Sequence, residues 1–533
     1  SENFRTLNVY EDPDINKSLI HLSQAAVVEE AITQFENGQK DQTVKDIFLT
    51  APTGAGKSLL FQLPAIYLAK EYNAVTIVIS PLIALMKDQV EALKNDRGYL
   101  NVAYINSELS LIDREDVLDR VHKGEISILY LSPELLLSYE LSTFIGEREL
   151  GLLVVDEAHL VTTWGRDFRV DYWYLGNYVR KIRKYYPYKF TVMAVTATAV
   201  YGGPNDMAFE TLDSLSMENA LMYIGKVRRE NIDFDIQQTR ISSSHEREKL
   251  ELSARRIEEL INDGKKSIIY CPWTNQLTQI RDQVDNDYRG AVGRYYGGLE
   301  KEIKTETYEK FKNNEIKTIV STKAFGMGVD IDDITCVYHH APSGHLADYV
   351  QEIGRLARKE NRGIAKIDFN KKDLKYTKIL YGLSSIKQYQ VQMVLDKILK
   401  IHQLKKKRNL VVSVDDFQHI FNFENTDVEQ KVKSSLLLLE KDLISKYQYN
   451  VLIARPKSLY TTVFARIYTD QEGDFLKKFG SMSKNIHDRD IEEKGMKVFS
   501  IELDKVWEHY HSDKSFPLTK KEYFEKTLFE DDG

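Results

Sequence analysis

The sequence predicts an α/β protein with two tandem parallel-sheet domains, followed by a C-terminal helical and winged-helix-like region. The first observation is a series of apolar, β-prone runs at 47–50, 74–80, 126–132, 150–157 and 190–198. A second series follows at 266–271, 316–322, 335–341 and 363–369. Continuous rather than alternating hydrophobicity is typical of strands that are buried on both faces of a parallel sheet. The two series therefore predict two α/β domains, joined near residues 223–234.

Length and composition limit the class of protein. A chain of 533 residues is too long for one core and predicts about three or four domains. No apolar run approaches the ~18 residues of a membrane span. The N-terminus "SENFRTLNVYEDPD" is polar and acidic, unlike a signal peptide. These features predict a cytoplasmic protein that makes no membrane contact.

The cysteines and the net charge exclude further classes. Cys271 and Cys336 are the only cysteines, which excludes a disulfide framework and a four-cysteine zinc site within this chain. Both stand in apolar, strand-like runs, which favours small core residues. The net charge of −7 argues against general attraction to nucleic acid but leaves room for a local basic groove.

The C-terminal part differs in character, because Lys-rich helical stretches follow residue 371. Segments 413–422 and 426–444 begin with capping residues and predict helices. Segment 445–467 predicts two β-runs around an "ARPKS" turn, and helix, helix, hairpin is the order of a winged helix. The predicted domains are residues 1–225, 226–370, a Lys-rich connector at 371–412, the winged-helix-like domain at 413–467 and an accessory region at 468–533.

The stretch "APTGAGKS", residues 51–58, predicts a phosphate-binding loop. It departs from the GxxxxGK[ST] pattern because Ala51 stands in place of the first Gly. An apolar run precedes it and a helical pattern follows, so the backbone amides of residues 54–56 can surround a phosphate at a helix N-terminus. Lys57 would then reach the β/γ-phosphates and Ser58 would hold Mg²⁺. A Gly-containing turn that binds nothing is the alternative.

The run "LLVVDEAH" ends a buried strand with two carboxylates, Asp156 and Glu157. Open α/β sheets bind ligands at this carboxyl edge. Beside a phosphate loop, Asp156 can hold the Mg²⁺ shell and Glu157 can polarise the attacking water. A solvated strand end is the alternative, which the "TAT" strand end at 196–198 and the second α/β domain disfavour.

Residues 345–360 predict a helix with two distinct faces. At 100° per residue, one face carries Leu346, Tyr349, Val350, Ile353 and Ala357, and the opposite face carries Gln351, Arg355 and Arg358. A solvated helix face would show the same pattern. If the second domain closes on the first, the two guanidinium groups would meet the γ-phosphate, as an arginine finger does.

The motifs together resemble a known family. "APTGAGKS", "SPLIALMKDQV", "DEAH", "TAT", "SIIYCPW", "STKAFGMGVD" and "QEIGRLAR" stand in the order of the superfamily 2 helicase motifs. "SPLIALMKDQV" and "AFGMGVD" specifically resemble the RecQ family of DNA helicases, and the resemblance covers about residues 20–370. It implies two RecA-like domains with Mg-ATP in the cleft between them. Hydrolysis would be coupled to 3′-to-5′ movement on single-stranded DNA.

The resemblance also implies roles for individual residues. The implied catalytic residues are Lys57, Asp156, Glu157, Gln351, Arg355 and Arg358, with Arg358 as the arginine finger. The implied nucleotide contacts are Gln24, which would read adenine, with Thr53, Gly54, Ala55, Gly56, Lys57, Ser58, Gly328 and Asp330. Ser58 and Asp156 would hold Mg²⁺, and His159, Thr196 and Thr198 would couple hydrolysis to movement.

Nucleic-acid contacts are expected in two places. The aromatic-rich loop at 162–176 resembles one that contacts DNA, with Trp164, Phe168 and Arg169 as matching residues. Arg166 stands there where the family usually has His. A core-packing aromatic loop is the alternative. At the predicted hairpin tip, Arg455 and Lys457 would lie near phosphates, unless they are solvated surface charges.

The sequence also departs from the family pattern. "GRLAR" replaces the usual "GRAGR", so Leu356 and Ala357 stand in place of Ala and Gly. The zinc module that normally follows is absent, and the Lys-rich helix ending in "LKKKR" at 404–408 takes its place in the chain order.

Two functional hypotheses follow. The first is an ATP-driven DNA helicase or translocase that acts on single-stranded or partly duplex DNA. The second is an ATPase that clamps or remodels nucleic acid in a repair or defence complex without unwinding it. An RNA substrate stays open because the motifs contact the backbone. Protein partners are expected at the C-terminal region.

Overall fold

The computed structural model describes residues 4–81, 83–106, 109–162, 170–199, 201–202, 206–226, 229–240, 245–325, 331, 333–344, 346–358, 362–377, 386–406, 410, 412, 414–421, 428–454, 462–486, 492 and 495–511. The chain divides into two compact units, Ser1–Ser385 and Ile386–Gly533. The first unit holds both α/β domains that the sequence predicts. None of the described helices is long and apolar enough to cross a membrane.

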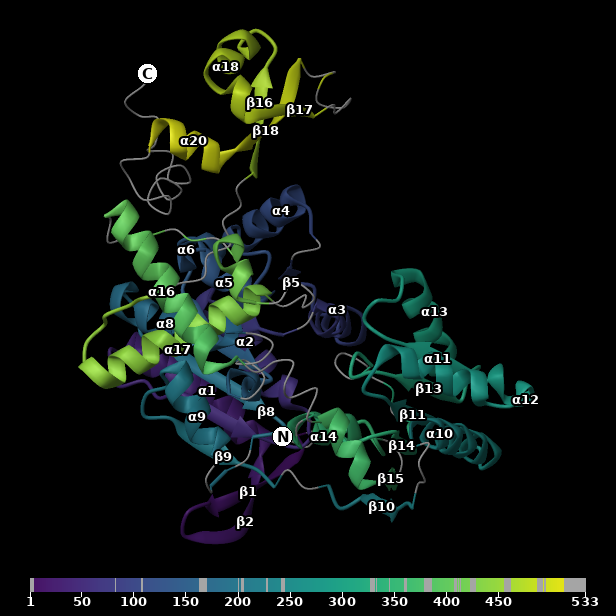
Figure 1. Ribbon diagram of the computed structural model, residues 1–533. Coiled ribbons are helices and arrows are strands. Elements are labelled where there is room, and N and C mark those ends of the chain that lie inside the picture. The colour runs from purple at the N-terminus through teal and green to yellow at the C-terminus, as the bar shows by residue number, and fades with distance from the viewer. Residues whose placement is uncertain are drawn as a thin grey trace. The chain divides into compact units, whose positions relative to one another are not determined.

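The first domain, drawn from purple to blue in Figure 1, is built on a parallel sheet with the strand order β5-β6-β4-β7-β8-β3-β9 among the described residues. The strands are β3 Ile47–Thr50, β4 Val75–Ile79, β5 Val102–Ile105, β6 Ile128–Leu131, β7 Leu150–Asp156, β8 Thr191–Thr196 and β9 Leu221–Ile224. The α-helices are α1 Gln24–Gln39, α2 Lys57–Tyr72, α3 Ile83–Glu91, α4 Leu111–His122, α5 Pro133–Ser138, α6 Leu141–Ile145, α8 Val170–Tyr185 and α9 Met207–Leu215. An antiparallel hairpin, β1 Thr6–Asp12 and β2 Asn16–Ser23, precedes α1.

Both faces of this sheet are buried. In β3, Ile47 and Leu49 belong to one apolar cluster, whereas Phe48 belongs to another. Because successive side chains of a strand point to opposite faces, the two clusters are the cores above and below the sheet. Burial on both faces is why these strands appear in the sequence as continuous apolar runs.

The second domain repeats this arrangement, with the strand order β10-β15-β14-β11-β13-β12 among the described residues. The strands are β10 Ile232–Gln238, β11 Ser267–Tyr270, β12 Val292–Tyr295, β13 Thr318–Ser321, β14 Cys336–His339 and β15 Gly363–Phe369. The helices are α10 His245–Asn262, α11 Thr274–Gln283, α12 Asn286–Arg289, α13 Lys301–Lys312 and α14 Leu346–Ile353, with the short 3₁₀ turn η3 at Lys371–Asp373. Cys271 and Cys336 are free and buried in this domain's core, as predicted.

The connection between the two sheets is short. It runs from β9, an edge strand of the first sheet, to β10, an edge strand of the second. The Gly225 amide donates to the Thr50 carbonyl at 3.0 Å, and the Lys226 amide donates to the Asn8 carbonyl at 2.9 Å. A Cβ at Gly225 would lie 2.2 Å from the Thr50 carbonyl oxygen, so only glycine fits there. The connection is therefore fixed to the first domain up to Lys226.

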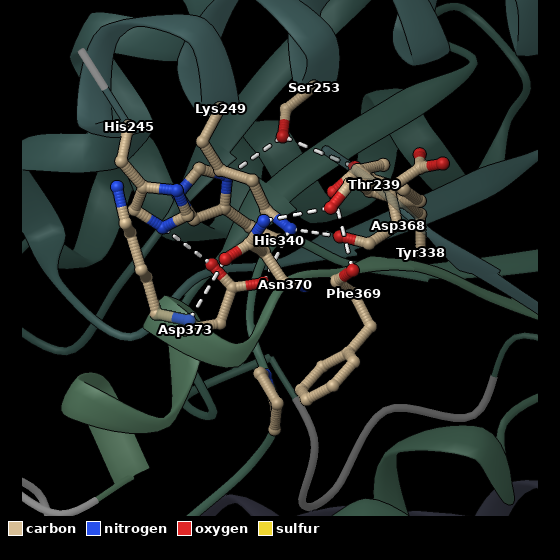
Figure 2. Close-up of polar contacts among 12 residues, drawn as sticks. Thr239, His245, Lys249, Ser253, Tyr338, His340, Asp368, Phe369, Asn370 and Asp373 are labelled. Carbon is tan, nitrogen blue, oxygen red and sulfur yellow. Dashed lines mark hydrogen bonds and ion pairs between the residues drawn. The ribbon is translucent and has the colours of Figure 1, made fainter. Parts of the chain in front are cut away.

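A buried polar cluster holds α10 to the end of β15 (Figure 2). The Asp373 carboxylate pairs with Lys249 Nζ at 2.8 Å and with His245 Nε2 at 2.9 Å. Its Oδ2 atom also accepts the Asn370 amide at 2.8 Å, and Lys249 Nζ donates to the Asp368 carbonyl. Lys249 and Asp373 are fully buried. We call His245, Lys249, Asp368 and Asp373 the α10 cluster.

The second unit contains helices and an antiparallel sheet. Its described elements are α16 Gln388–Lys405, η4 Val414–Ile420, α17 Val428–Tyr447, β16 Thr462–Tyr468, α18 Glu472–Phe479, η5 Gly480–Met482, β17 Ser483–Ile486, β18 Met496–Glu502 and α20 Leu503–Tyr510. Val394, Phe417 and Val432 bring α16, η4 and α17 into one apolar cluster. Two parallel sheets followed by this helical and antiparallel region confirm the predicted fold class.

The predicted winged-helix hairpin is wrong in its pairing. Helix α17 continues to Tyr447, and the described residues 448–454 form no strand. The second predicted β-run is β16, but it pairs with β18 at 496–502. The predicted boundary at residue 467 would therefore separate two strands of one sheet. The turn that carries Arg455 and Lys457 lies outside the described residues.

The predicted helix at 345–360 is shorter than its periodicity indicates. Helix α14 ends at Ile353, and turns follow from Gly354. Leu346, which belongs to the apolar face of the predicted helix, is 69% exposed. Arg355 and Arg358 therefore lie beyond the helix and do not share a helical face with Gln351.

Candidate functional site

The phosphate loop joins β3 to α2, as the sequence predicts. Gly54 and Gly56 have φ angles of 81° and 75°, values that glycine adopts without strain. Helix α2 begins at Lys57, and Gly56 at its N-cap makes no side-chain capping hydrogen bond. Ser58 is the second residue of this helix. An uncapped helix N-terminus behind a glycine loop fits a phosphate group.

Gln24 and Arg5 form hydrogen bonds with backbone carbonyls of the phosphate loop. Gln24 Nε2 donates to the Ala55 carbonyl at 2.8 Å, and its Oε1 accepts the Arg5 amide at 3.0 Å. Arg5 Nη1 donates to the Gly54 carbonyl at 3.0 Å. A Cβ at Gly56 would lie 2.8 Å from Gln24 Nε2. Gln24 thus orients the loop here, and its contact with adenine stays a prediction.

The Lys57 ammonium group forms hydrogen bonds with carbonyl oxygens of its own loop. Its Nζ donates to Ala51 at 3.2 Å and to Pro52 at 3.3 Å. Burial lowers the pKa of Lys57, whereas the charges of Glu157 and Asp156 raise it. A cation held by backbone carbonyls can exchange them for phosphate oxygens without breaking a salt bridge.

Asp156 and Glu157 end β7 close to Lys57. Burial and the adjacent Glu157 raise the pKa of Asp156, which favours a cation beside it. Burial alone would raise the pKa of Glu157, but the hydrogen bond from His159 and the charges of His159, Lys57 and Arg355 lower it overall. Glu157 also has a φ of 49°, in the left-handed region. The pair can therefore hold a divalent cation and keep an ionised carboxylate beside it.

His159 links the ends of β7 and β8. Its Nδ1 lies 3.0 Å from Thr196 Oγ1 and 3.4 Å from Glu157 Oε2. The Thr198 amide donates to Thr196 Oγ1 at 3.2 Å. The structure thus brings together the three residues that were assigned to coupling, although coupling itself stays a prediction.

The turn after α14 brings two arginines to this site. Thr53 Oγ1 in the phosphate loop donates to the Gly354 carbonyl at 3.0 Å. The charge of Arg355 lowers the pKa of Glu157, and that of Arg358 lowers the pKa of Lys57. Both arginines therefore act electrostatically on the Lys57 and Glu157 pair, whereas half-buried Gln351 lies on α14 itself.

Sequence reasoning missed Arg5, Arg229 and Asn231. Arg229 donates from Nη2 to the Ala357 carbonyl at 2.6 Å and from Nη1 to the Gly354 carbonyl at 3.3 Å. Asn231 Nδ2 donates to the same Ala357 carbonyl at 3.1 Å. Arg229 and Asn231 are more than 120 positions from the turn that they hold. No local sequence pattern predicts a contact between residues so far apart in the chain.

Other predicted site residues lie outside the described residues, so their roles stay predictions. They are Trp164, Arg166, Phe168, Arg169, Gly328, Asp330, Arg455 and Lys457.

Two family models match the chain: the DEAD/DEAH box helicase over residues 24–205 and the helicase conserved C-terminal domain over residues 251–360. The chain is 30% identical to the probable ATP-dependent DNA helicase RecS of Bacillus subtilis, over 83% of this chain and 88% of RecS. It is 32% identical to the ATP-dependent DNA helicase RecQ of the same bacterium, over 68% of this chain and 55% of RecQ. The chain thus spans most of RecS but little more than half of RecQ.

Solved structures share the fold. The DUF1998 helicase MrfA, bound to DNA and AMPPNP, matches with a TM-score of 0.53 at 18% identity, over 70% of this chain and 53% of MrfA. Mss116p, bound to single-stranded RNA and AMP-PNP, matches with a TM-score of 0.53 at 14% identity, over 83% of this chain and 89% of Mss116p. At these identities the likeness concerns the fold alone.

Proposed function

This chain belongs to the RecQ-like superfamily 2 ATP-dependent helicases, and we propose that it moves 3′-to-5′ along single-stranded DNA by hydrolysing Mg-ATP between its two parallel-sheet domains. The observation that carries the proposal is the contact between the two domains, in which Thr53 Oγ1 of the phosphate loop donates to the Gly354 carbonyl at 3.0 Å. Arg355 and Arg358 follow α14 in the second domain, yet their charges act on Glu157 and Lys57 in the first. A nucleotide bound beside Lys57 would therefore respond to movement of the second domain.

The first domain would hold the triphosphate. The amides of Gly54, Ala55 and Gly56 and the first turn of α2 would bind its oxygens, and Lys57 would exchange the loop carbonyls for the β/γ-phosphates. Ser58 and Asp156 would hold Mg²⁺, which neutralises charge on the β- and γ-oxygens when bound.

Glu157 would orient and polarise the attacking water. Because the pKa of Glu157 is lowered, its carboxylate is ionised at neutral pH and can accept a hydrogen bond from that water. His159 holds the carboxylate from the other side and passes its orientation to Thr196. A change at the phosphate would thereby reach the end of β8.

The two arginines would complete the site when the domains close. Each would stabilise negative charge on the transferred γ-phosphoryl group, and an arginine finger of this kind is worth ~10³–10⁵ in rate. Arg358 is the finger by resemblance, with Arg355 and Gln351 beside it. Separation of the domains would withdraw both charges together.

The loop that carries Trp164, Phe168 and Arg169 would contact single-stranded DNA. Aromatic rings stack on unpaired bases at ~1–3 kcal/mol per base, and a cation among them can bind phosphate. This contact would transmit DNA binding to Glu157 through the adjoining "DEAH" segment.

A second function is an ATPase that clamps or remodels nucleic acid without unwinding it. The net charge of −7 leaves it open, because a chain with this charge has no general attraction to a polyanion. It would use the same ATP site but release no strand from a duplex.

Steady-state ATP hydrolysis tests the proposal, measured without nucleic acid, with single-stranded DNA and with single-stranded RNA, and with Glu157→Gln as the blank. Strong stimulation by DNA is expected, and activity indifferent to both polymers would contradict a DNA motor. Unwinding of duplexes with a 3′ or a 5′ tail then tests direction. DNA-stimulated hydrolysis with no strand release from either would favour the clamp.

A further inference from the structure

We propose that Arg229 and Asn231 are positioning residues that hold the turn at residues 354–357, and so keep Arg355 and Arg358 aimed at the nucleotide. The inference rests on the proposed function, because it concerns the arginines of that same site. Neither residue contacts the phosphate loop in the hydrogen bonds described above. Their role would be exerted through the backbone of the turn.

The turn contains a backbone conformation that alanine adopts unwillingly. Ala357 has a φ of 48°, in the left-handed region where a Cβ atom is strained. Helicases with the usual "GRAGR" have glycine at this position, and glycine adopts such angles freely. In this chain an alanine must be held there by other contacts.

Those contacts are present on both sides of Ala357. Its carbonyl accepts two hydrogen bonds, from Arg229 Nη2 at 2.6 Å and from Asn231 Nδ2 at 3.1 Å. Its amide donates to the Ile334 carbonyl at 3.0 Å. The adjoining Leu356 is fully buried in the core of the second domain. The strained residue is therefore fixed at its amide, its carbonyl and its neighbour.

Arg229 also spans the length of the turn. One guanidinium nitrogen bonds the Gly354 carbonyl at its start, and another bonds the Ala357 carbonyl at its end. The planar fork of arginine can bridge two carbonyls in a fixed geometry, which the single ammonium of lysine cannot reproduce. The Gly354 carbonyl is also the acceptor of the phosphate-loop Thr53 hydroxyl. Arg229 thus contacts an atom of the second domain that also bonds the phosphate loop of the first.

Electrostatics argue against a role for Arg229 in packing alone. Burial and the like charge of Arg358 both lower the pKa of Arg229, so its cation is costly at this position. A neutral side chain would avoid that cost. The paired carbonyl bonds offset it and leave a rigid support beside Arg358.

The experiment compares Arg229→Ala with Arg289→Ala as a matched control. Arg289 also donates to backbone carbonyls in the second domain, at Val284 and Asp282, but lies on the short helix α12. DNA-stimulated ATP hydrolysis should lose about 10-fold or more in kcat for Arg229→Ala, with KM for ATP changed less than about threefold. Arg289→Ala should keep kcat within about twofold. Equal kcat in the two variants would overturn the inference.

A combined variant separates positioning from simple destabilisation. If Arg229 acts through Arg355 and Arg358, adding Arg229→Ala to a variant that carries both Arg355→Ala and Arg358→Ala should not slow hydrolysis further. Losses that multiply would mean that Arg229 acts elsewhere. Normal hydrolysis by Arg358→Ala would instead contradict the proposed function itself, so the two failures are distinguishable.

Further variants keep the inference testable if Arg229→Ala folds poorly. Arg229→Lys keeps the charge but not the bridge, and Asn231→Ala removes one of the two donors to Ala357. Both should lower kcat with little change in KM, and Asn231→Ala should have the smaller effect. Adding Ala357→Gly to Asn231→Ala should restore part of kcat, because glycine needs no support at this φ. No loss in either single variant would also overturn the inference.

Discussion

Two clusters of this protein each combine a lysine, a histidine and two acidic residues, and they differ in what these groups bond. The α10 cluster contains two aspartates, whereas the proposed nucleotide site contains Lys57, Asp156, Glu157 and His159. In the α10 cluster, Lys249 and His245 each take one oxygen of Asp373 (Figure 2). In the nucleotide site, Lys57 bonds backbone carbonyls instead.

The difference shows how similar sets of lysine, histidine and acidic residues can form a structural contact in one place and a candidate ligand site in another. Opposite charges that pair internally have no further need of a ligand, so the α10 cluster fixes α10 to the end of β15. Two adjoining carboxylates repel each other, which is one cause of the raised pKa of Asp156. That repulsion is relieved by a cation. We therefore expect a bound cation to stabilise the proposed nucleotide site, whereas the charges of Lys249 and Asp373 already stabilise the fold without a ligand.

The largest expected effect tests whether the arginine turn belongs to the nucleotide site. Arg358→Ala should retain nucleotide binding and lose ~10³–10⁵ in hydrolysis, because the charge is needed in the transition state. Fluorescent nucleotide binding and steady-state hydrolysis check the two parts. Arg294→Ala is the control, since this half-buried arginine bonds only the Thr278 hydroxyl among the hydrogen bonds described. Equal loss of binding and hydrolysis would mean that Arg358 is structural.

The next effect concerns the carboxylate that polarises water. Glu157→Gln should lower hydrolysis by ~10²–10⁴ and leave the melting temperature unchanged, because the amide keeps the shape but cannot accept a proton. Glu140→Gln, which alters a surface carboxylate paired with Lys181 at 2.6 Å, should leave hydrolysis unchanged. Near-normal turnover by Glu157→Gln would remove it from the active site.

Two lysine variants compare the clusters directly. Lys249→Met leaves Asp373 without its buried cation and should cost ~3–5 kcal/mol of unfolding free energy. Lys57→Met should abolish hydrolysis, because the phosphates lose their cation. It should cost little stability, because Lys57 bonds only backbone carbonyls among the described contacts. Urea denaturation of both variants and of the unchanged chain makes the measurement. Similar stability losses would show that the two clusters do not differ as described.

The smallest effect is the pH dependence of stability beside the α10 cluster. Burial lowers the pKa of His340 to about 3, and the charges of Lys249 and His245 act in the same direction. An unfolded histidine titrates near ~6.5, so the unfolded state binds more protons between these values. Stability should therefore fall as the pH drops below ~6.5, by up to ~1.4 kcal/mol per pH unit from this group. Urea titrations should show a shallower fall for His340→Gln, and identical slopes would contradict the assignment.

The sequence was sufficient to predict the parts of the fold that depend on local pattern. Doubly buried strands such as β7 gave continuous apolar runs, and the strand, loop and helix around Lys57 were predicted in place. The end of α14 was not predicted, because the helical periodicity of the sequence continues through Arg358 whereas Gly354 and Ala357 adopt turn conformations. The pairing of β16 with β18 depends on residues far apart in the chain, as does the contact of Arg229 with Ala357.

The connection between β9 and β10 limits how the two domains can move. Gly225 and Lys226 are bonded to the first domain, and Arg229 and Asn231 are bonded to the arginine turn of the second. Only residues 227–228 lie between Lys226 and Arg229, and the three Cα–Cα steps that join those two residues extend no further than about 11 Å. The length of this connection therefore limits how far the adjoining edges of the two sheets, at β9 and β10, can separate. When one domain rotates about this short connection, the far edges of the two sheets are displaced more than the edges that it joins.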